Sequence, residues 1–292
     1  MTYRLLFFLV PVILLSFTAC KQDDIEPSWL KLNSVNLVTN SVAEGENSHN
    51  ITDLWVYKGN EAIGVFEVGK TLPILDEGTH KFTFWAGVNN NGISATKIRY
   101  PFYEKVEMDI SLTKSDTTSV DLTFNYKEGL QFSLKEDFED SGIDFAPTPE
   151  SDTPFVFIHK ASYPDIVQYG EKCGAVFLTA TDTFFRAETD LQIPVPTGQQ
   201  SFLELDYYND NSLSQGFISN LTSGTDDQGL VILMNGQDPE NLKWKHIYIE
   251  LSENVGKHVN TTSIELYFVA FLEKGKSSAN IYVDNIKVVH FP

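Results

Sequence analysis

One stretch decides the fold class: Leu54-Trp55-Val56-Tyr57-Lys58-Gly59-Asn60-Glu61-Ala62-Ile63-Gly64-Val65-Phe66. Two apolar runs flank Gly59-Asn60, and this pair supplies the positive φ angles that a tight hairpin turn requires. Strands joined by so short a turn pair antiparallel. Similar alternating runs recur about every 8–12 residues, separated by Gly, Asn, Asp and Pro, and no window has the spacing of an amphipathic helix. The sequence therefore predicts an all-β protein.

Around this hairpin the chain divides into two predicted domains. The 292 residues include 21 Phe and 12 Tyr, which suit the buried faces of strands. The alternating pattern resets between Tyr126 and Leu134. We therefore expect an immunoglobulin-like or transthyretin-like β-sandwich over residues 34–128 and a second β-sandwich over residues 129–292. The expected strands cover residues 35–42, 54–57, 62–68, 81–86, 106–112 and 120–126, and then 155–159, 175–178, 202–209, 217–219, 230–234, 244–251, 263–272 and 280–290.

The second predicted domain carries three short motifs: Asp137-Phe138-Glu139-Asp140, Phe202-Leu203-Glu204-Leu205-Asp206-Tyr207-Tyr208 and Ile281-Tyr282-Val283-Asp284-Asn285-Ile286-Lys287-Val288. Through these motifs it resembles the β-jelly rolls of carbohydrate-binding modules and related lectin-like domains. The resemblance implies that the opening and closing strands lie side by side and that a glycan is the ligand. It also implies a structural calcium ion held by Glu139 and Asp284, whose oxygens are hard ligands. The alternative is that Glu139 is solvated and that Asp284 belongs to a bend.

The first 19 residues have the parts of a secretory signal peptide: a basic start, an apolar stretch and a small residue, Ala19, before Cys20. Ala19-Cys20 resembles the cleavage site of bacterial lipoproteins, in which the cysteine is lipidated. Lys21-Gln22-Asp23-Asp24 resembles the export signal of Bacteroidota surface lipoproteins. We therefore expect a signal peptide over residues 1–19, a lipid on Cys20, a tether over residues 20–33 and a place on the outer membrane facing the cell exterior. A plain signal peptide and a periplasm-facing anchor are the alternatives.

Charge and cysteine content limit the partners. The chain has 40 acidic and 21 basic side chains and a formal net charge of −19. Because it has no basic cluster, we expect no nucleic-acid binding, and we expect membrane contact only through the lipid on Cys20. Cys173 is the one other cysteine, so the mature chain can form no internal disulfide, and we expect Cys173 to be a packing residue.

Aromatic side chains are the candidate ligand-binding groups, because sugar rings stack on exposed aromatic faces beside polar groups that bond their hydroxyls. The candidates are Tyr208, Asn209, Trp244 and Tyr163. Trp55 and Trp85 alternate with apolar neighbours, and we expect them in the core of the first domain.

One strand carries a candidate catalytic pair. Glu204 and Asp206 are two residues apart, so their carboxylates lie on one face of the strand. This resembles the Glu-x-Asp-x-Glu strand of laminarinase-like glycosidases, but Tyr208 stands where that family has its acid/base glutamate. A retaining mechanism needs two carboxyl groups, so a divergent glycosidase is a lesser alternative to an exposed strand face. None of the common catalytic motifs appears elsewhere, so we assign no catalytic residue.

Together these features predict a non-enzymatic surface lipoprotein whose C-terminal jelly roll binds a glycan or another extracellular ligand, with the first domain as a spacer. The alternative is a structural or adhesion component of the cell envelope that contacts extracellular proteins. The sequence indicates neither the ligand nor the oligomeric state.

Overall fold

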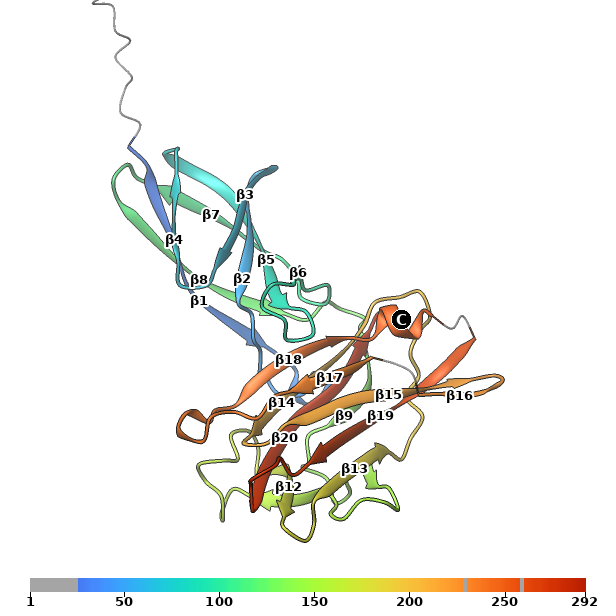
Figure 1. The fold of residues 1–292 in the computed structure, drawn as a ribbon. Helices are drawn as coiled ribbons and strands as arrows, with labels where there is room; N and C mark the ends of the chain where they lie inside the picture. Colours follow the sequence, from blue (N-terminus) through green and yellow to red (C-terminus); the bar gives the residue numbers. More distant parts are fainter. Residues whose placement is uncertain (1–25, 228–229, 258–259) are drawn as a thin grey trace, which may run out of the picture.

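The computed structural model describes residues 26–227, 230–257 and 260–292. Within these ranges the chain forms two β-domains, each with two sheets (Figure 1). The all-β fold class with a jelly-roll sandwich is confirmed. The predicted signal peptide and the predicted lipid site at Cys20 lie outside the described residues. No helix in the described part of the chain is long and apolar enough to cross a membrane.

The first domain is a sandwich of two sheets. Its elements are β1 (Ser28–Val38), α2 (Ser41–Glu44), β2 (Asp53–Lys58), β3 (Glu61–Glu67), β4 (Thr71–Ile74), β5 (Gly78–Asn89), β6 (Lys97–Arg99), β7 (Val106–Leu112) and β8 (Thr117–Asn125). One sheet has the order β4-β1-β8, and the other has the order β3-β2-β5-β6 with β7 also paired to β5. The core lies between the two sheets.

The predicted hairpin is confirmed, because β2 and β3 pair antiparallel across Gly59-Asn60. Gly59 has a φ of +56°, which glycine adopts without the penalty that a Cβ would bring. Trp55 and Trp85 are cross-strand neighbours on the outer face of this sheet, so their expected place in the core is wrong. The alternating residues Leu54 and Phe84 take the inner positions instead.

The first domain begins earlier than expected. β1 starts at Ser28, so the predicted tether over residues 20–33 and the domain start at residue 34 are wrong. The physical reason is that Leu30 and Leu32 alternate into the core and are almost fully buried. The predicted junction at residues 128/129 falls between β8 and the first strand of the second domain.

The second domain supplies the other two sheets. Its elements are β9 (Gln131–Glu136), β10 (Phe145–Pro147), β11 (Val156–His159), β12 (Lys172–Thr179), β13 (Phe184–Thr189), β14 (Ser201–Asn209), β15 (Leu213–Leu221), β16 (Gly224–Asp226), β17 (Val231–Met234), η1 (Pro239–Asn241), β18 (Lys245–Glu250), α3 (Ser252–Val255), β19 (Thr261–Phe271) and β20 (Ser278–His290). One sheet has the order β11-β12-β20-β14-β18, with β9 also paired to β20. The other has the order β10-β13-β19-β15-β16, with β17 also paired to β15.

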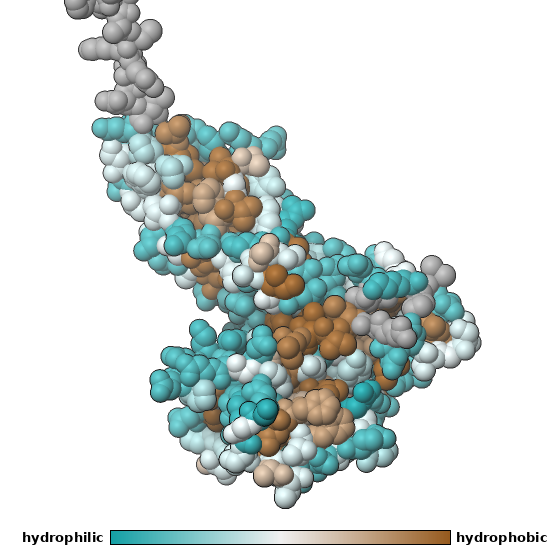
Figure 2. Space-filling view, viewed as in Figure 1, coloured by the Kyte–Doolittle hydropathy of each residue, from teal (hydrophilic) through white to brown (hydrophobic). Residues whose placement is uncertain are grey.

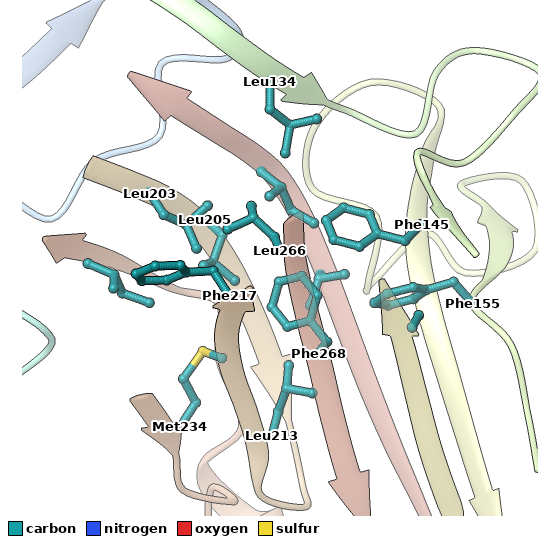
Figure 3. Packing of buried hydrophobic residues seen from close by; sticks show 14 of the residues in the cluster. Leu134, Phe145, Phe155, Leu203, Leu205, Leu213, Phe217, Met234, Leu266 and Phe268 are labelled. Atoms are coloured by element: carbon teal, nitrogen blue, oxygen red, sulfur yellow. The ribbon is translucent and has the colours of Figure 1, made fainter. Parts of the chain in front are cut away.

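The opening and closing strands of the second domain lie side by side, as the jelly-roll resemblance implied. β9 pairs antiparallel with β20. Between the two sheets, Leu203 and Leu205 of β14 face Phe217 of β15 and Phe268 of β19 (Figure 3). This large apolar core explains how the domain holds together although its one cysteine, Cys173, is unpaired.

The first domain packs end-on against the outer face of the sheet that contains β14, β18 and β20 (Figure 1). Phe202, Tyr248 and Val289 of that sheet belong to the same buried cluster as Tyr100 of the first domain. The Tyr100 ring centroid lies 5.2 Å from that of Phe202 and 4.6 Å from that of Tyr248. Asn90 forms a parallel bridge with Tyr248, so the first domain also covers the edge strand β18. The first domain is therefore in direct contact with the sheet face on which ligand binding was predicted.

Candidate functional site

The predicted carboxylate pair lies under the first domain. Glu204 is 0% exposed and Asp206 is 2% exposed, so the expected exposed strand face is wrong. The alternation of β14 places Leu203 and Leu205 in the core and turns both carboxylates the other way, as predicted. The sequence pattern could not show that a second domain covers that face.

The buried carboxylate of Glu204 is held by groups from both domains. Tyr100 and Tyr126 of the first domain donate their hydroxyl hydrogens to its two oxygens. From the second domain, His246 Nε2 lies 3.5 Å and Lys287 Nζ lies 3.8 Å from Glu204 Oε2. We call these five residues the junction cluster. Burial raises the pKa of Glu204, but Lys287, His246 and Tyr100 outweigh it and lower that pKa to about 2.

This environment does not suit glycosidase chemistry at Glu204. A general acid needs a raised pKa and access to the glycosidic oxygen, whereas Glu204 has a lowered pKa and no exposed surface. Ser48, His246 and Asp206 do not form a catalytic triad either, because Ser48 Oγ and Asp206 Oδ1 both contact the same ring nitrogen, Nδ1. These polar groups stabilise the contact between the domains.

The structure brings together two of the predicted aromatic residues. The ring centroid of Tyr208 lies 5.9 Å from that of Trp244 and 5.7 Å from that of Tyr282. Tyr208 and Tyr282 are cross-strand partners on β14 and β20, and Trp244 precedes β18 on the other side of β14. Trp244 Nε1 donates a hydrogen bond to the carbonyl of Ile166, which fixes the indole ring against the loop over residues 160–171. Sequence reasoning could not foresee Tyr282 here, because only strand register places it beside Tyr208.

The other two predicted ligand residues differ in their access to solvent. Tyr163 lies in the same loop and is exposed. Asn209 is fully buried, and its side-chain amide donates to the carbonyls of Asn211, Met234 and Asn235. Its predicted role in ligand binding is therefore wrong, because its donors are used to hold a turn.

Trp244 lines one hollow and Tyr208 lines another. The larger, which we call the junction pocket, has a volume of about 460 Å³. The first domain contributes His49, Asn50 and Asn89 to its lining, and the second contributes Lys243, Trp244 and Lys245 among others. The smaller hollow is about 200 Å³ and is lined by Tyr208 and Tyr282 with Asp210 and Asn280. The larger volume falls within the range of about 300–1,000 Å³ that is common for small-ligand pockets.

The residues of the junction pocket on the first domain were missed by sequence reasoning. Asn50 Nδ2 donates to the carbonyl of His246, and the backbone N–H of Asn50 donates to the hydroxyl of Tyr248. These contacts join residues almost 200 positions apart, so no local pattern could indicate them. Lys243-Trp244-Lys245 was visible in the sequence as an aromatic residue between two cations, and that signal was not used.

The predicted calcium ligands, Glu139 and Asp284, repel each other electrostatically and differ in their hydrogen-bond partners. Glu139 Oε1 accepts hydrogen bonds from the backbone N–H groups of Glu171 and Lys172. Asp284 is buried, and its Oδ2 has no hydrogen-bond partner among the described residues. Burial raises the pKa of Asp284 well above its usual value, and Asp206 adds to the shift. In the described ranges no group of three or more His, Cys, Asp or Glu side chains is arranged to hold a metal ion, so calcium stays a prediction that rests on Asp284 Oδ2.

Cys173 is fully buried in a small apolar cluster with Val167 and Tyr282 beneath the loop over residues 160–171. Burial raises the pKa of its thiol above the usual value. A buried thiol with a raised pKa is a poor nucleophile, so this position fits the expected packing role.

A second surface lies on the outer face of the other sheet of the second domain. Figure 2 shows apolar side chains gathered over β17 and its neighbours. Val231, Leu233 and Phe271 are 51%, 56% and 64% exposed. Strand register places them on one face with Tyr267, whose ring lies against Gly216. We call this the apolar strip.

Comparison with known proteins gives no family. No protein-family model matches the chain, and no curated protein matches it. Among solved structures it is similar to one of the carbohydrate-binding modules from the β-sandwich superfamily, with 15% identity over 81% of this chain and 84% of that chain and a TM-score of 0.38.

Two further solved structures are carbohydrate-binding modules as well. A xylan-binding domain from Paenibacillus barcinonensis has 11% identity over 54% of this chain and 99% of that chain, with a TM-score of 0.38. A family 11 module from Clostridium thermocellum, in complex with a mixed-linked tetrasaccharide, has 15% identity over 55% of this chain and 95% of that chain, with a TM-score of 0.35. These three structural neighbours are all carbohydrate-binding modules.

Proposed function

We propose that this protein binds a glycan at the junction pocket, with Trp244 as the stacking surface and polar groups from both domains as hydrogen-bond partners. The observation that carries the proposal is the position of Trp244, which lines the pocket together with asparagine and lysine residues and whose ring centroid lies 5.9 Å from that of Tyr208. Ligand pockets combine an aromatic surface with a few polar groups that fix orientation. The two hollows, of about 460 and 200 Å³, give room for more than one sugar unit.

Asn89 supports the proposal. Its side-chain Oδ1 is buried and has no hydrogen-bond partner among the described residues, and Asn89 lines the junction pocket. A buried acceptor without a partner costs about 1–3 kcal/mol. A ligand hydroxyl that donates to Asn89 Oδ1 would remove that cost.

We also propose that the protein is non-enzymatic and is held at the outer surface of the cell by a lipid on Cys20. The burial of Glu204 and Asp206 supports the first part, because the one carboxylate pair that resembled a catalytic pair cannot reach a substrate. The Ala19-Cys20 site and the acidic segment after it support the second part. Metabolic labelling with a fatty acid analogue tests the lipid: Cys20→Ala should abolish labelling, and labelling that persists in this variant would refute it.

The glycan proposal can be tested by affinity electrophoresis of the purified protein in gels that contain individual polysaccharides. Trp244→Ala should abolish retardation by whichever polysaccharide the wild type binds, and Asn89→Ala should weaken it. Phe271→Ala, which removes an exposed aromatic ring from the apolar strip, is the matched control and should bind as the wild type does. Thermal melts of each variant separate lost binding from lost folding. Retention of binding by folded Trp244→Ala would refute the site, and loss in Phe271→Ala would move it to the apolar strip.

A structural or adhesion role is the second candidate, and the apolar strip favours it. Exposed apolar residues that share one face are a common feature of protein-contact surfaces. If the strip binds an extracellular protein, Leu233→Ser should abolish that contact and leave glycan binding unchanged. Crosslinking on whole cells, with wild type and Leu233→Ser compared, tests this, and identical crosslinked species would argue against it.

A further inference from the structure

The junction pocket concentrates basic side chains in an acidic protein. Lys243, Lys245, His49 and His246 all line it, and none of the described lining residues is Asp or Glu. The whole chain has 40 acidic and 21 basic side chains, so such a lining departs from the average surface. In contrast, a hollow beside β9 has four acidic lining residues.

The ammonium groups of the two pocket lysines form no ion pair or hydrogen bond within the described structure. Lys58, Lys97 and Lys135 lie 2.6, 2.6 and 3.2 Å from a carboxylate oxygen. Among the described residues, the ammonium groups of Lys243 and Lys245 have no carboxylate within ion-pair distance and no hydrogen-bond acceptor. Both positive charges therefore remain available to a ligand.

The buried charges behind the pocket do not cancel these lysines. Glu204 and Asp206 are paired with Lys287 and His246 at distances of 2.8–3.8 Å. Burial lowers the pKa of His246, but the Asp206 and Glu204 carboxylates outweigh it and raise that pKa, so both carboxylates have basic partners of their own. Lys243 and Lys245 are therefore the pocket-lining cations that have no carboxylate partner among the described residues.

We infer that the junction pocket takes an acidic glycan, whose carboxylate or sulfate groups bind Lys243 and Lys245 while a sugar ring stacks on Trp244. The inference rests on the proposed glycan binding and adds the charge of the ligand. An ammonium group bonded to an anionic oxygen makes a stronger contact than a neutral pair does. The net charge of −19 repels acidic polymers from the rest of the surface, so binding is confined to the lysine pair.

Affinity electrophoresis and calorimetry with four polymers test the inference. Polygalacturonate carries carboxylates, chondroitin sulfate carries sulfates as well, and xylan and laminarin serve as neutral probes. We compare the wild type with Lys243→Gln/Lys245→Gln and with the control Lys114→Gln/Lys274→Gln, which removes the same charge from exposed positions elsewhere. The pocket variant should bind the preferred acidic polymer at least about tenfold more weakly, whereas the control should stay within about twofold.

The outcomes distinguish a preference for acidic glycans from glycan binding itself. Tighter binding of an acidic polymer, lost in the pocket variant and weakened by added salt, supports the inference, and the choice between the two acidic polymers identifies the anionic group. Tighter binding of a neutral polymer that Trp244→Ala abolishes overturns the inference and leaves the proposed function standing. Equal weakening in both lysine variants also overturns it, because the effect would then be one of net charge. Failure of all four polymers to bind overturns both.

Discussion

Replacing Glu204 with Gln tests whether the junction cluster stabilises the protein. The substitution keeps the size of the side chain and removes its charge. Lys287 then keeps a buried positive charge without its carboxylate, and His246 keeps Asp206 as its one carboxylate partner. Tyr100 and Tyr126 lose an ionic acceptor. Removing one partner from a buried ion pair costs about 3–5 kcal/mol.

The lowered pKa of Glu204 leads to a similar value for the same set of contacts. Its pKa is lowered from 4.5 to about 2, because Lys287, His246 and Tyr100 outweigh the opposing effect of burial. A shift of one unit corresponds to about 1.4 kcal/mol, so a shift of this size corresponds to about 3 kcal/mol. We therefore expect Glu204→Gln to lower the free energy of unfolding by about 3 kcal/mol.

Urea unfolding followed by tryptophan fluorescence measures this loss. Glu150→Gln is the control, since Glu150 is exposed on a loop and should change stability by less than about 0.5 kcal/mol. The double variant Glu204→Gln/Lys287→Met should lose less than the sum of the two single variants, because each single change leaves the other charge unpaired. A loss below about 1 kcal/mol in Glu204→Gln, or strict additivity in the double variant, would refute the reasoning.

The pH dependence of the same variant has a defined sign. Because folding lowers the pKa of Glu204, its contribution is complete above about pH 4.5 and is lost as the pH falls towards 2. The difference in stability between wild type and Glu204→Gln should therefore shrink across this range. A constant difference from pH 6 to pH 2.5 would contradict the assignment.

Three further predictions concern other parts of the structure. If calcium binds at Asp284, EDTA should lower the melting temperature of the wild type and leave that of Asp284→Asn unchanged. If calcium does not bind there, Asp284→Asn should be more stable than the wild type at pH 7. The reason is that burial raises the pKa of the Asp284 carboxyl and so disfavours its charged form. The Cys173 thiol should react with a disulfide reagent only after denaturation, and fast labelling of the native protein would argue against its burial. Gly87→Ala should destabilise the protein by about 1–3 kcal/mol in urea unfolding, because an added Cβ would overlap the Trp55 ring. An unchanged midpoint would show that the ring moves freely.

The sequence predicted the structure best where it depends on residues that are close together in the chain. The hairpin at Gly59-Asn60 follows from two residues that permit a tight turn, and it formed as expected. The strand over 106–112 alternates strictly and was predicted to the residue. β13 (Phe184–Thr189) was missed because its buried positions, Phe185, Ala187 and Thr189, include only one large apolar residue. Arg186 and Glu188 alternate with them and form an ion pair on the outer face.

The site was predicted less well because its geometry depends on strand register and domain contact. Tyr208 and Trp244 were named from their chemistry, and register across β14 and β18 brought them together. Asn209 has an amide that could bond to a ligand. In the structure that amide donates to the carbonyls of Asn211 and Met234 in a turn that the local sequence does not reveal. Glu204 is the clearest case, since an alternating strand looks the same whether its polar face meets water or another domain.

In the proposed site the first domain is more than a spacer, because it supplies part of the pocket lining. His49, Asn50 and Asn89 line the pocket opposite Lys243 and Lys245. The distance across the pocket depends on how the domains contact each other. That contact combines buried aromatic rings with buried charged and hydroxyl groups that require directed partners. An apolar contact could slide without leaving a charge unpaired, whereas the junction cluster cannot. Glu204→Gln should for this reason weaken glycan binding even though Glu204 touches no ligand, and calorimetry on the folded variant should show lower affinity with unchanged stoichiometry; unaltered affinity would show that the pocket does not depend on the cluster.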